Sequence, residues 1–268
     1  MNRTKIPWAL NPDGSPGYSL NPITGCWGPD GSVDNPKRCP WCYAWELAQS
    51  RLCETYLANT RIIAGGRDDP FAPRLWADRL YIPEGRKPKG IFMCDMSDML
   101  GDWVPDYMVK DIVVAMKLRP TYRFYVLTKN PKRLAEFNPW PENVWVGATA
   151  THAQACFDAV KYLAWVEATT TYISFEPLLE PILNRTFGYP NAFPGRWTQQ
   201  NLPLVLRDAG ISWAITGPLN GKLAHMHPCN PEWLEQIRTV CDEAGVALFE
   251  KPECGQLLNR PLRQEFPK

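Results

Sequence analysis

The chain has 268 residues, of which 45% are hydrophobic and 21% are charged, a composition that is typical of globular proteins and excludes a disordered or collagen-like chain. Its formal net charge of +1 argues against a protein that coats nucleic acid through bulk positive charge. No run of about 18 apolar residues could span a membrane, and residues 1–10 lack the apolar segment of a secretory signal. We therefore expect a cytoplasmic protein without a membrane partner.

The chain begins with about forty residues rich in Pro, Gly and Asn, which predict an ordered loop with an early strand near Ser19–Thr24. Apolar residues then recur at helical spacing from Tyr43 to Ala58, which predicts one helix. Short apolar stretches rich in β-branched and aromatic residues predict strands at Gly90–Cys94, Tyr122–Leu127, Val144–Gly147, Thr171–Phe175, Ser212–Thr216 and Val246–Phe249. Amphipathic stretches predict helices at Pro105–Leu118, Pro131–Phe137, His152–Val166 and Pro231–Ala244.

Strands that alternate with helices at this spacing are typical of a parallel sheet with helical crossovers. The leading prediction is therefore an α/β fold, as a complete or partial (β/α) barrel, the TIM barrel being the best-known closed form. An open doubly wound sheet is the alternative. No long spacer interrupts the alternation, so we expect residues 1–268 to form a single domain.

Small polar and charged residues follow the predicted strands at their carboxyl ends. In parallel barrels this end of the sheet carries the active site. The candidate residues at this end are Asp95, Ser97, Asp98, Thr128, Lys129, Thr149, Glu176 and Lys251. As a set they indicate a functional site, and the alternative is that the strands simply end where polar residues return. Glycine-rich phosphate loops are absent, and three histidines are too few for a typical metal-hydrolase site.

The most specific signal is a group of three cysteines in the N-terminal loop, at about residues 20–45. Nine cysteines in a chain without a secretory signal favour metal or cofactor ligation over a disulfide framework. Cys39 and Cys42 form a Cys-x-x-Cys pair at the start of the first predicted helix, and Cys26 lies at the end of the first predicted strand. Three thiolates are an incomplete set for structural zinc but suit a four-iron cluster with one iron left open.

The segment Cys39–Ala44 resembles the second half of the cysteine motif of radical S-adenosylmethionine (radical-SAM) enzymes. The wider pattern resembles a phage-associated three-cysteine-motif family of radical-SAM-like proteins. The matching segments span most of the chain: Asn21–Cys26, Cys39–Ala44, Met93–Asp98, Val126–Pro131, Asn143–Thr149, Ser174–Leu178 and Phe249–Lys251. One departure is that residues 27–38 separate Cys26 from Cys39, a longer spacing than in most radical-SAM motifs, so we expect this loop to bulge outward.

The resemblance implies a barrel of the radical-SAM type and an enzyme with two cofactors. A [4Fe-4S] metal centre on Cys26, Cys39 and Cys42 would bind and reductively cleave S-adenosyl-L-methionine, and the 5′-deoxyadenosyl radical would abstract hydrogen from an unidentified substrate. An electron donor such as flavodoxin or ferredoxin would reduce the iron-sulfur cluster. The candidates for cofactor binding are Asp95, Ser97, Asp98, Thr128 and Thr149. The candidates for catalysis or substrate binding are Lys129, Glu176 and Lys251.

Charge offers a weaker indication of the substrate. Six basic residues and no acidic residue lie between Ile112 and Ala135: Lys117, Arg119, Arg123, Lys129, Lys132 and Arg133. A solvated helix-and-loop face is the commoner explanation for such a set, and the alternative is that, with Arg86, Lys87 and Lys89, it forms a groove for a phosphate-bearing substrate such as a nucleotide or nucleic acid. The implied phage association favours a nucleobase-related substrate. A zinc- or cluster-stabilised module that binds nucleic acid or protein without catalysis remains the alternative function.

Overall fold

The computed structural model describes residues 1–85, 87–188 and 195–267, so Arg86 of the predicted basic groove lies outside the described residues. The chain divides into two compact units. The first comprises Met1–Arg133 and Trp140–Trp145, and the second comprises Leu134–Pro139 and Val146–Lys268. The prediction of a single domain stays a prediction. Among the described residues, none of the helices combines the length and the hydropathy needed to span a bilayer.

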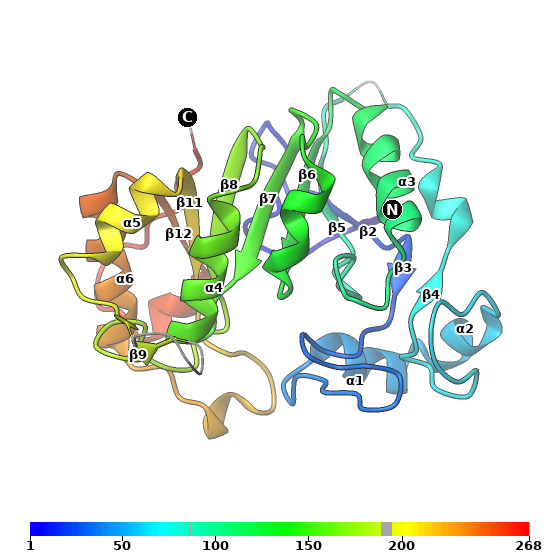
Figure 1. Cartoon of the computed structure of the whole chain (residues 1–268), viewed down its shortest axis with the longest axis horizontal. Coiled ribbons are helices and arrows are strands. Elements are labelled where there is room, and N and C mark those ends of the chain that lie inside the picture. The colour runs from blue at the N-terminus through cyan, green and yellow to red at the C-terminus, as the bar shows by residue number, and fades with distance from the viewer. Residues whose placement is uncertain (86, 189–194, 268) are drawn as a thin grey trace. The chain divides into compact units, whose positions relative to one another are not determined.

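Eight strands make up a mainly parallel sheet with the order β1-β2-β5-β6-β7-β8-β11-β12 (Figure 1). The strands β2, β5 and β6 pair in parallel, as do β8, β11 and β12, whereas the short strand β1 is antiparallel to β2. The predicted α/β fold class with a parallel sheet is confirmed. Their bounds are β1 Asn2–Arg3, β2 Tyr18–Leu20, β5 Gly90–Met93, β6 Arg123–Thr128, β7 Val144–Thr149, β8 Thr170–Phe175, β11 Ile211–Thr216 and β12 Ala247–Glu250.

In the first unit the predicted early strand is split into two. Tyr18–Leu20 joins the large sheet as β2, whereas β3 (Ile23–Thr24) pairs with β4 (Arg74–Leu75) in a separate two-stranded sheet. The break falls at Asn21-Pro22, where proline has no N–H to continue a strand ladder. The split matters because β3 leads directly into Cys26.

The prediction of one helix from Tyr43 to Ala58 is wrong. The segment forms α1 (Tyr43–Gln49) and α2 (Cys53–Ala58). The hydroxyl of Ser50 donates to the carbonyl of Glu46 at 2.7 Å, a local bond that competes with continued helix. Both short helices bury apolar residues in one cluster with Phe71 and Met96, which explains why the apolar spacing continues across the break.

The two helices predicted between residues 105 and 137 are found in position but not both in type, and the second runs from residues of the first unit into residues of the second. The helix α3 (Asp106–Lys117) matches the predicted one, and Val109, Ile112 and Met116 form its buried face. The segment Pro131–Phe137 is a 3₁₀ helix, η2, rather than an α-helix. A further 3₁₀ turn, η1 (Ala77–Leu80), was not predicted and contacts α3.

In the second unit α5 and α6 pack on each other and beside β11 and β12 (Figure 1). The helix α6 (Pro231–Ala244) has the predicted bounds because both of its ends are capped. The side chain of Asn230 accepts the Glu232 N–H at 2.9 Å, and Gly245 ends the helix with φ of +73°. The remaining elements are α4 Ala153–Leu163, β9 Thr186–Phe187, β10 Gly195–Arg196, α5 Leu202–Asp208, η3 Ala224–Met226 and η4 Pro252–Gln256.

Candidate functional site

The loop after β5 is tied to the end of β2 by one amide side chain. The Nδ2 of Asn21 donates to Oδ1 of Asp95 at 2.6 Å, and the Met96 N–H donates to Oδ1 of Asn21 at 3.0 Å. The pKa of Asp95 is raised by burial, although hydrogen bonds from Asn21 and Ser19 oppose the rise. Cys94 precedes this loop with φ of +56°, a left-handed conformation that turns the chain sharply after the strand.

A glycine positions Cys26 between two segments of the first unit. Gly25 has φ of +86°, and a Cβ there would lie 2.6 Å from the carbonyl oxygen of Phe71, so only glycine fits. Its N–H donates to the Met96 carbonyl at 2.9 Å, and the Ser97 hydroxyl donates to the Gly25 carbonyl at 2.6 Å. The next residue, Cys26, donates its N–H to the Phe71 carbonyl at 3.2 Å. The backbone of Cys26 is therefore held on both sides.

The segment that carries Phe71 is itself organised by Arg74, which sequence reasoning missed. Its side chain is fully buried, and its guanidinium donates to four backbone carbonyls at 2.7–3.1 Å, those of Asn59, Arg67, Asp69 and Ala72. Desolvation lowers the pKa of Arg74, and Asp69 opposes this. Only the fold reveals this role, because the four carbonyls come from a loop without a recognisable sequence pattern.

The loop between Cys26 and Cys39 folds back on itself. The Lys37 N–H donates to the Trp27 carbonyl at 2.7 Å, and a Cβ on Gly28 would clash with the Lys37 carbonyl. Arg38 then lies 4.8 Å from the centre of the Trp27 ring and donates from Nε to the Cys26 carbonyl at 3.3 Å. The long spacing in the sequence is thus compatible with a return of the chain to Cys26.

The three predicted ligand cysteines are free and half-buried. The Sγ of Cys26 accepts the Gly28 N–H at 3.2 Å, and the Sγ of Cys42 accepts the Trp45 N–H at 3.4 Å. The Cys42 N–H donates to the Cys39 carbonyl at 3.0 Å, which closes the turn between them. Burial raises the pKa of both Cys42 and Cys26, that of Cys26 to about 12, so ligation of metal would release protons from these thiols.

The ammonium of Lys129 interacts electrostatically with all three cysteines, although the residue as a whole is exposed. Desolvation lowers its pKa, but the neighbouring acidic groups raise it by more, so that the net shift is upward. These groups are Cys39, Asp98, Cys26 and Cys42. The three cysteines therefore share the electrostatic influence of one positive charge of the first unit.

The side chain of Asp98 is bonded to the backbone N–H of Lys129. The buried carboxylate accepts the Thr128 hydroxyl at 2.7 Å, the Lys129 N–H at 2.8 Å and the Leu100 N–H at 3.0 Å. These bonds hold the end of β6 against the loop after β5. Asp98 and Thr128 are therefore already hydrogen-bonded within the chain.

The three cysteines supply the thiol donors that an iron-sulfur cluster requires. Within the described ranges, no group of three or more His, Cys, Asp or Glu side chains could hold one metal ion. Two of the thiols accept backbone N–H groups, as cluster-bound sulfur atoms do. Five other cysteines are buried: Cys94, Cys156, Cys229, Cys241 and Cys254.

In the second unit the structure brings Glu176 and Lys251 together. The Nζ of Lys251 forms an ion pair with Glu176 and lies 3.9 Å from Oε2 of Glu253. A Cβ on Gly217 would lie 2.9 Å from Cδ of Lys251, so glycine leaves room for the lysine stem. Lys251 is therefore already paired with carboxylates. Thr149 is buried at the end of β7.

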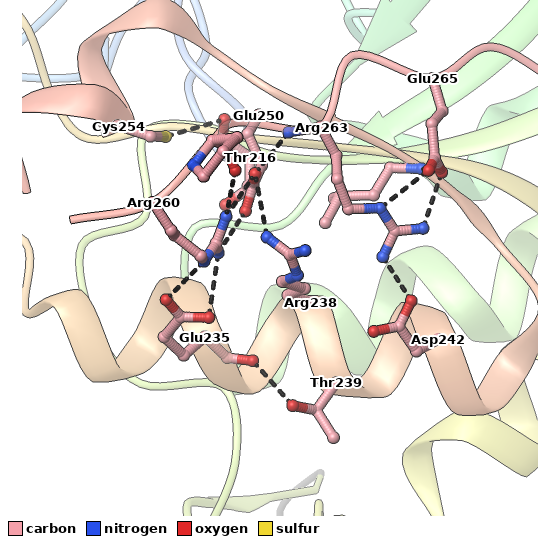
Figure 2. A network of polar contacts seen from close by, with 12 residues as sticks. Thr216, Glu235, Arg238, Thr239, Asp242, Glu250, Cys254, Arg260, Arg263 and Glu265 are labelled. Carbon is pink, nitrogen blue, oxygen red and sulfur yellow. Dashed lines mark hydrogen bonds and ion pairs between the residues drawn. The ribbon is translucent and has the colours of Figure 1, made fainter. Parts of the chain in front are cut away.

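Glu250, the neighbour of Lys251 in the sequence, belongs to a separate charge network (Figure 2). Its fully buried carboxylate accepts two hydrogen bonds from Arg260, at 2.7 and 2.9 Å, and the Arg263 N–H at 2.8 Å. Arg260 also binds both oxygens of Glu235 on α6. Both oxygens of Glu250 and both oxygens of Glu235 are occupied, so the network attaches the C-terminal segment to β12 and α6.

The chain matches the model of a protein family and is similar in structure to a solved protein. The model of a family described as "Protein of unknown function (DUF5131)" matches residues 3–262. None of the curated proteins matches the sequence. Among solved structures, the chain is similar to a mutant spore photoproduct lyase with bound AdoMet and dinucleoside spore photoproduct, at a TM-score of 0.44 and 12% identity. The alignment covers 87% of this chain and 62% of the lyase, so the chain spans less than two thirds of that protein.

Proposed function

Since the chain belongs to this family of unknown function, we propose its activity from the site itself: it is a radical S-adenosylmethionine enzyme. Cys26, Cys39 and Cys42 would hold a [4Fe-4S] cluster. When bound, the cluster and S-adenosyl-L-methionine would supply the one-electron chemistry that abstracts a hydrogen atom from a substrate. The proposal includes a nucleobase- or nucleotide-related substrate, an electron donor such as flavodoxin or ferredoxin, a cytoplasmic location and membership of the phage-associated three-cysteine-motif group.

One observation carries the proposal: the loop of residues 27–38 returns toward Cys26, and Cys26, Cys39 and Cys42 all interact electrostatically with the same ammonium, that of Lys129. A cationic side chain beside three thiolates offsets the negative charge that a thiolate-ligated cluster carries. The exposed face of Lys129 leaves it able to meet an anionic group of a cofactor or substrate.

The polar residues around the cysteines divide into two roles. Ser97, Asp98 and Thr128 each form hydrogen bonds within the chain, so we assign them the positioning of the loops rather than contact with S-adenosylmethionine. Asp95 lies on the same loop, and its raised pKa reflects a half-buried carboxylate that a ligand amine or hydroxyl would stabilise. Trp27 is buried next to Cys26 and would exclude water from the cluster.

In the second unit, we assign substrate contact to Glu176 and Lys251, with Thr149 as a further candidate. The Lys251 ammonium holds a proton at Nζ against the Glu176 carboxylate, so the pair offers a donor and an acceptor side by side. A substrate that reaches this pair would exchange hydrogen bonds with it rather than meet an unpaired positive charge. The pair therefore suits polar groups better than a bare phosphate.

Anaerobic reconstitution with iron and sulfide tests the proposal. The wild-type chain should acquire about four irons and, with dithionite and S-adenosylmethionine, should release 5′-deoxyadenosine. Cys26→Ala, Cys39→Ala and Cys42→Ala should each lose the cluster. Cys53→Ala is the matched control, because Cys53 is also free and half-buried but lies in α2 outside the motif.

Two results would contradict the proposal. The first is a colourless protein after reconstitution that holds tightly bound zinc instead, which would favour the zinc-stabilised binding module. The second is full iron content without any cleavage of S-adenosylmethionine, together with salt-dependent binding of nucleic acid, which would favour a cluster with a binding role.

A further inference from the structure

Tyr43 connects the cysteine turn to the loop of residues 94–98 that follows β5, hereafter the β5 loop. It comes directly after Cys42 and is the first residue of α1. Its hydroxyl donates to the Asp95 carbonyl at 2.6 Å, across 52 positions of the chain. The residue is nevertheless 52% exposed. A single hydroxyl group on the protein surface therefore joins the neighbour of Cys42 to a distant loop.

The β5 loop that accepts this bond is itself fixed. The Ser97 N–H donates to the Cys94 carbonyl at 2.9 Å, which closes a turn. The Met96 N–H donates to Oδ1 of Asn21 at 3.0 Å, which ties the turn to the end of β2. The carbonyl that Tyr43 binds lies within this braced turn. Its bond to the tyrosine therefore restrains the start of α1.

The same loop holds the residue that precedes Cys26. The Ser97 hydroxyl donates to the Gly25 carbonyl at 2.6 Å, and the Gly25 N–H donates to the Met96 carbonyl at 2.9 Å. Cys26 and Cys42 are thus each one residue away from a group that bonds to the β5 loop. The loop therefore connects the two cysteines through hydrogen bonds.

Packing places the two cysteines against one apolar cluster. Cys26 and Cys42 both contact this cluster, to which Met96 of the β5 loop and two alanines of α1 belong. The two thiols also interact electrostatically with each other. The Sγ of Cys42 accepts the Trp45 N–H at 3.4 Å, so the start of α1 determines where this sulfur lies. A shift of α1 over the cluster would move Cys42 relative to Cys26, and a bond from α1 to the β5 loop opposes that shift.

We propose that Tyr43 is a positioning residue for the proposed cluster, because its hydroxyl holds Cys42 near Cys26 for ligation of the same group. The inference rests on the proposed function, since it concerns the ligands of that cluster. Tyr43 acts through the β5 loop rather than as a ligand. Phenylalanine at this position would keep the ring and lose only the hydroxyl that reaches the loop.

The first test uses the metal-free full chain and a reagent that becomes fluorescent only when it bridges two nearby thiols. Tyr43→Phe should slow the bridging of Cys26 to Cys42 by about fivefold, the equivalent of one hydrogen bond. Peptide mass spectrometry identifies the bridged pair, and the rate of alkylation of Cys42 by iodoacetamide corrects for a change in its own reactivity. Tyr107→Phe is the matched control, because Tyr107 is also an exposed tyrosine in the first turn of a helix of the first unit.

Two further measurements separate positioning from a general loss of stability. Ser97→Ala breaks the bond from the same loop to Gly25 and should also slow the bridging. The double variant with Tyr43→Phe should be no slower than the slower single variant, because both bonds belong to one connection. Tyr43→Phe and Tyr107→Phe should melt at the same temperature, since water can replace an exposed hydrogen bond.

Iron content after reconstitution extends the test to the loaded protein. At limiting iron, Tyr43→Phe should retain less iron than Tyr107→Phe. A wild-type chain that acquires no iron would overturn the proposed function, whereas the bridging rates of the metal-free chain decide the role of Tyr43 independently.

Four results would overturn the inference about Tyr43. The wild type does not bridge Cys26 to Cys42, or Tyr43→Phe bridges them as fast as Tyr107→Phe does. The losses of the two single variants multiply in the double variant, which would show that the two bonds act independently. Tyr43→Phe melts earlier than Tyr107→Phe, which would show a general structural role.

Discussion

The two units of the chain hold their functional loops by different means. Around the cysteines of the first unit, hydrogen bonds that end on backbone groups and close glycine contacts position the loops, as at Gly25 and Asn21. In the second unit, ion pairs hold the C-terminal segment, as at Glu250 and Arg260 (Figure 2). The first arrangement leaves the three cysteines free of disulfide bonds. In the second, the charged side chains of Arg260, Glu235 and Glu250 pair with one another. Free thiols are available to ligate a cofactor, whereas paired charges are not. The first unit is therefore the better candidate for the proposed cluster.

The largest effect is expected from breaking the charge network of the second unit. Arg260→Met leaves the carboxylate of Glu250 buried without its main partner, and breaking a buried pair in this way costs about 3–5 kcal/mol. We expect a loss of this size in the free energy of unfolding, measured by urea denaturation.

Arg263→Met is the matched control for this prediction. Its ion-pair partners Asp242 and Glu265 have side chains that are 55% and 44% exposed, so the loss should stay below about 1 kcal/mol. Equal losses in the two variants would show that burial of Glu250 does not set the strength of the network.

A smaller effect is expected from blocking the glycine contacts of the first unit. Gly25→Ala adds the cost of a left-handed alanine, about 1–2 kcal/mol, to an overpacking cost of about 1–3 kcal/mol against the Phe71 carbonyl. The displaced Cys26 should also lower the iron content after reconstitution, which elemental analysis would measure.

The control is Gly14→Ala, because Gly14 has a similar φ of +80° but nothing lies within 4 Å of an added Cβ. This variant should lose only the backbone cost and should keep its iron. If Gly14→Ala reduced iron as much as Gly25→Ala, the close contact at Gly25 would not be what positions Cys26.

The smallest effect is an opposite response of the two units to pH. Hydrogen bonding to Arg260 holds the pKa of Glu235 below its ordinary value of 4.5, so its stabilisation is present above that pH and is lost as the pH falls. Burial raises the pKa of Asp95 instead, so its ionised form costs stability, and this cost disappears as the pH falls. As the pH falls, the free energy of unfolding of the wild type should therefore exceed that of Glu235→Gln by a smaller margin. Over the same range, the wild type should become more stable relative to Asp95→Asn.

Urea unfolding between pH 7 and pH 4 would measure both differences. The Glu235 contribution should remain below about 1 kcal/mol, since its side chain is 47% exposed and solvent screens the pair. Differences that changed in the same direction with pH would contradict the contrast between the two carboxyls.

The elements with clear apolar periods were the predictable part of the fold. The bounds of α6 follow from Asn230, Gly245 and a regular apolar face, all of which are local signals. The helix predicted over Tyr43–Ala58 was wrong because apolar spacing does not reveal whether Ser50 bonds to a nearby carbonyl. Because α1 and α2 both pack against the same apolar cluster, the apolar spacing continues across the point where the helix is interrupted.

For the candidate site, the residue types were predictable but their partners were not. The spacing of Cys39 and Cys42 predicts metal ligation from the sequence alone, and Cys26 joins the predicted ligand set because of its place after the first predicted strand. The return of residues 27–38 depends on contacts among Trp27, Gly28 and Lys37 that no local pattern encodes.

By itself, the amino-acid order determined the alternation of strands and helices, the polar residues at the strand ends and the three thiols, because each depends on neighbours a few residues away. Only the tertiary structure decided which partners those groups meet. Lys251 meets Glu176, and Arg74 meets four carbonyls, across distances in the chain that no local signal spans. Charge and hydrogen-bond capacity are satisfied by whatever lies nearby in space, and the fold determines what lies nearby.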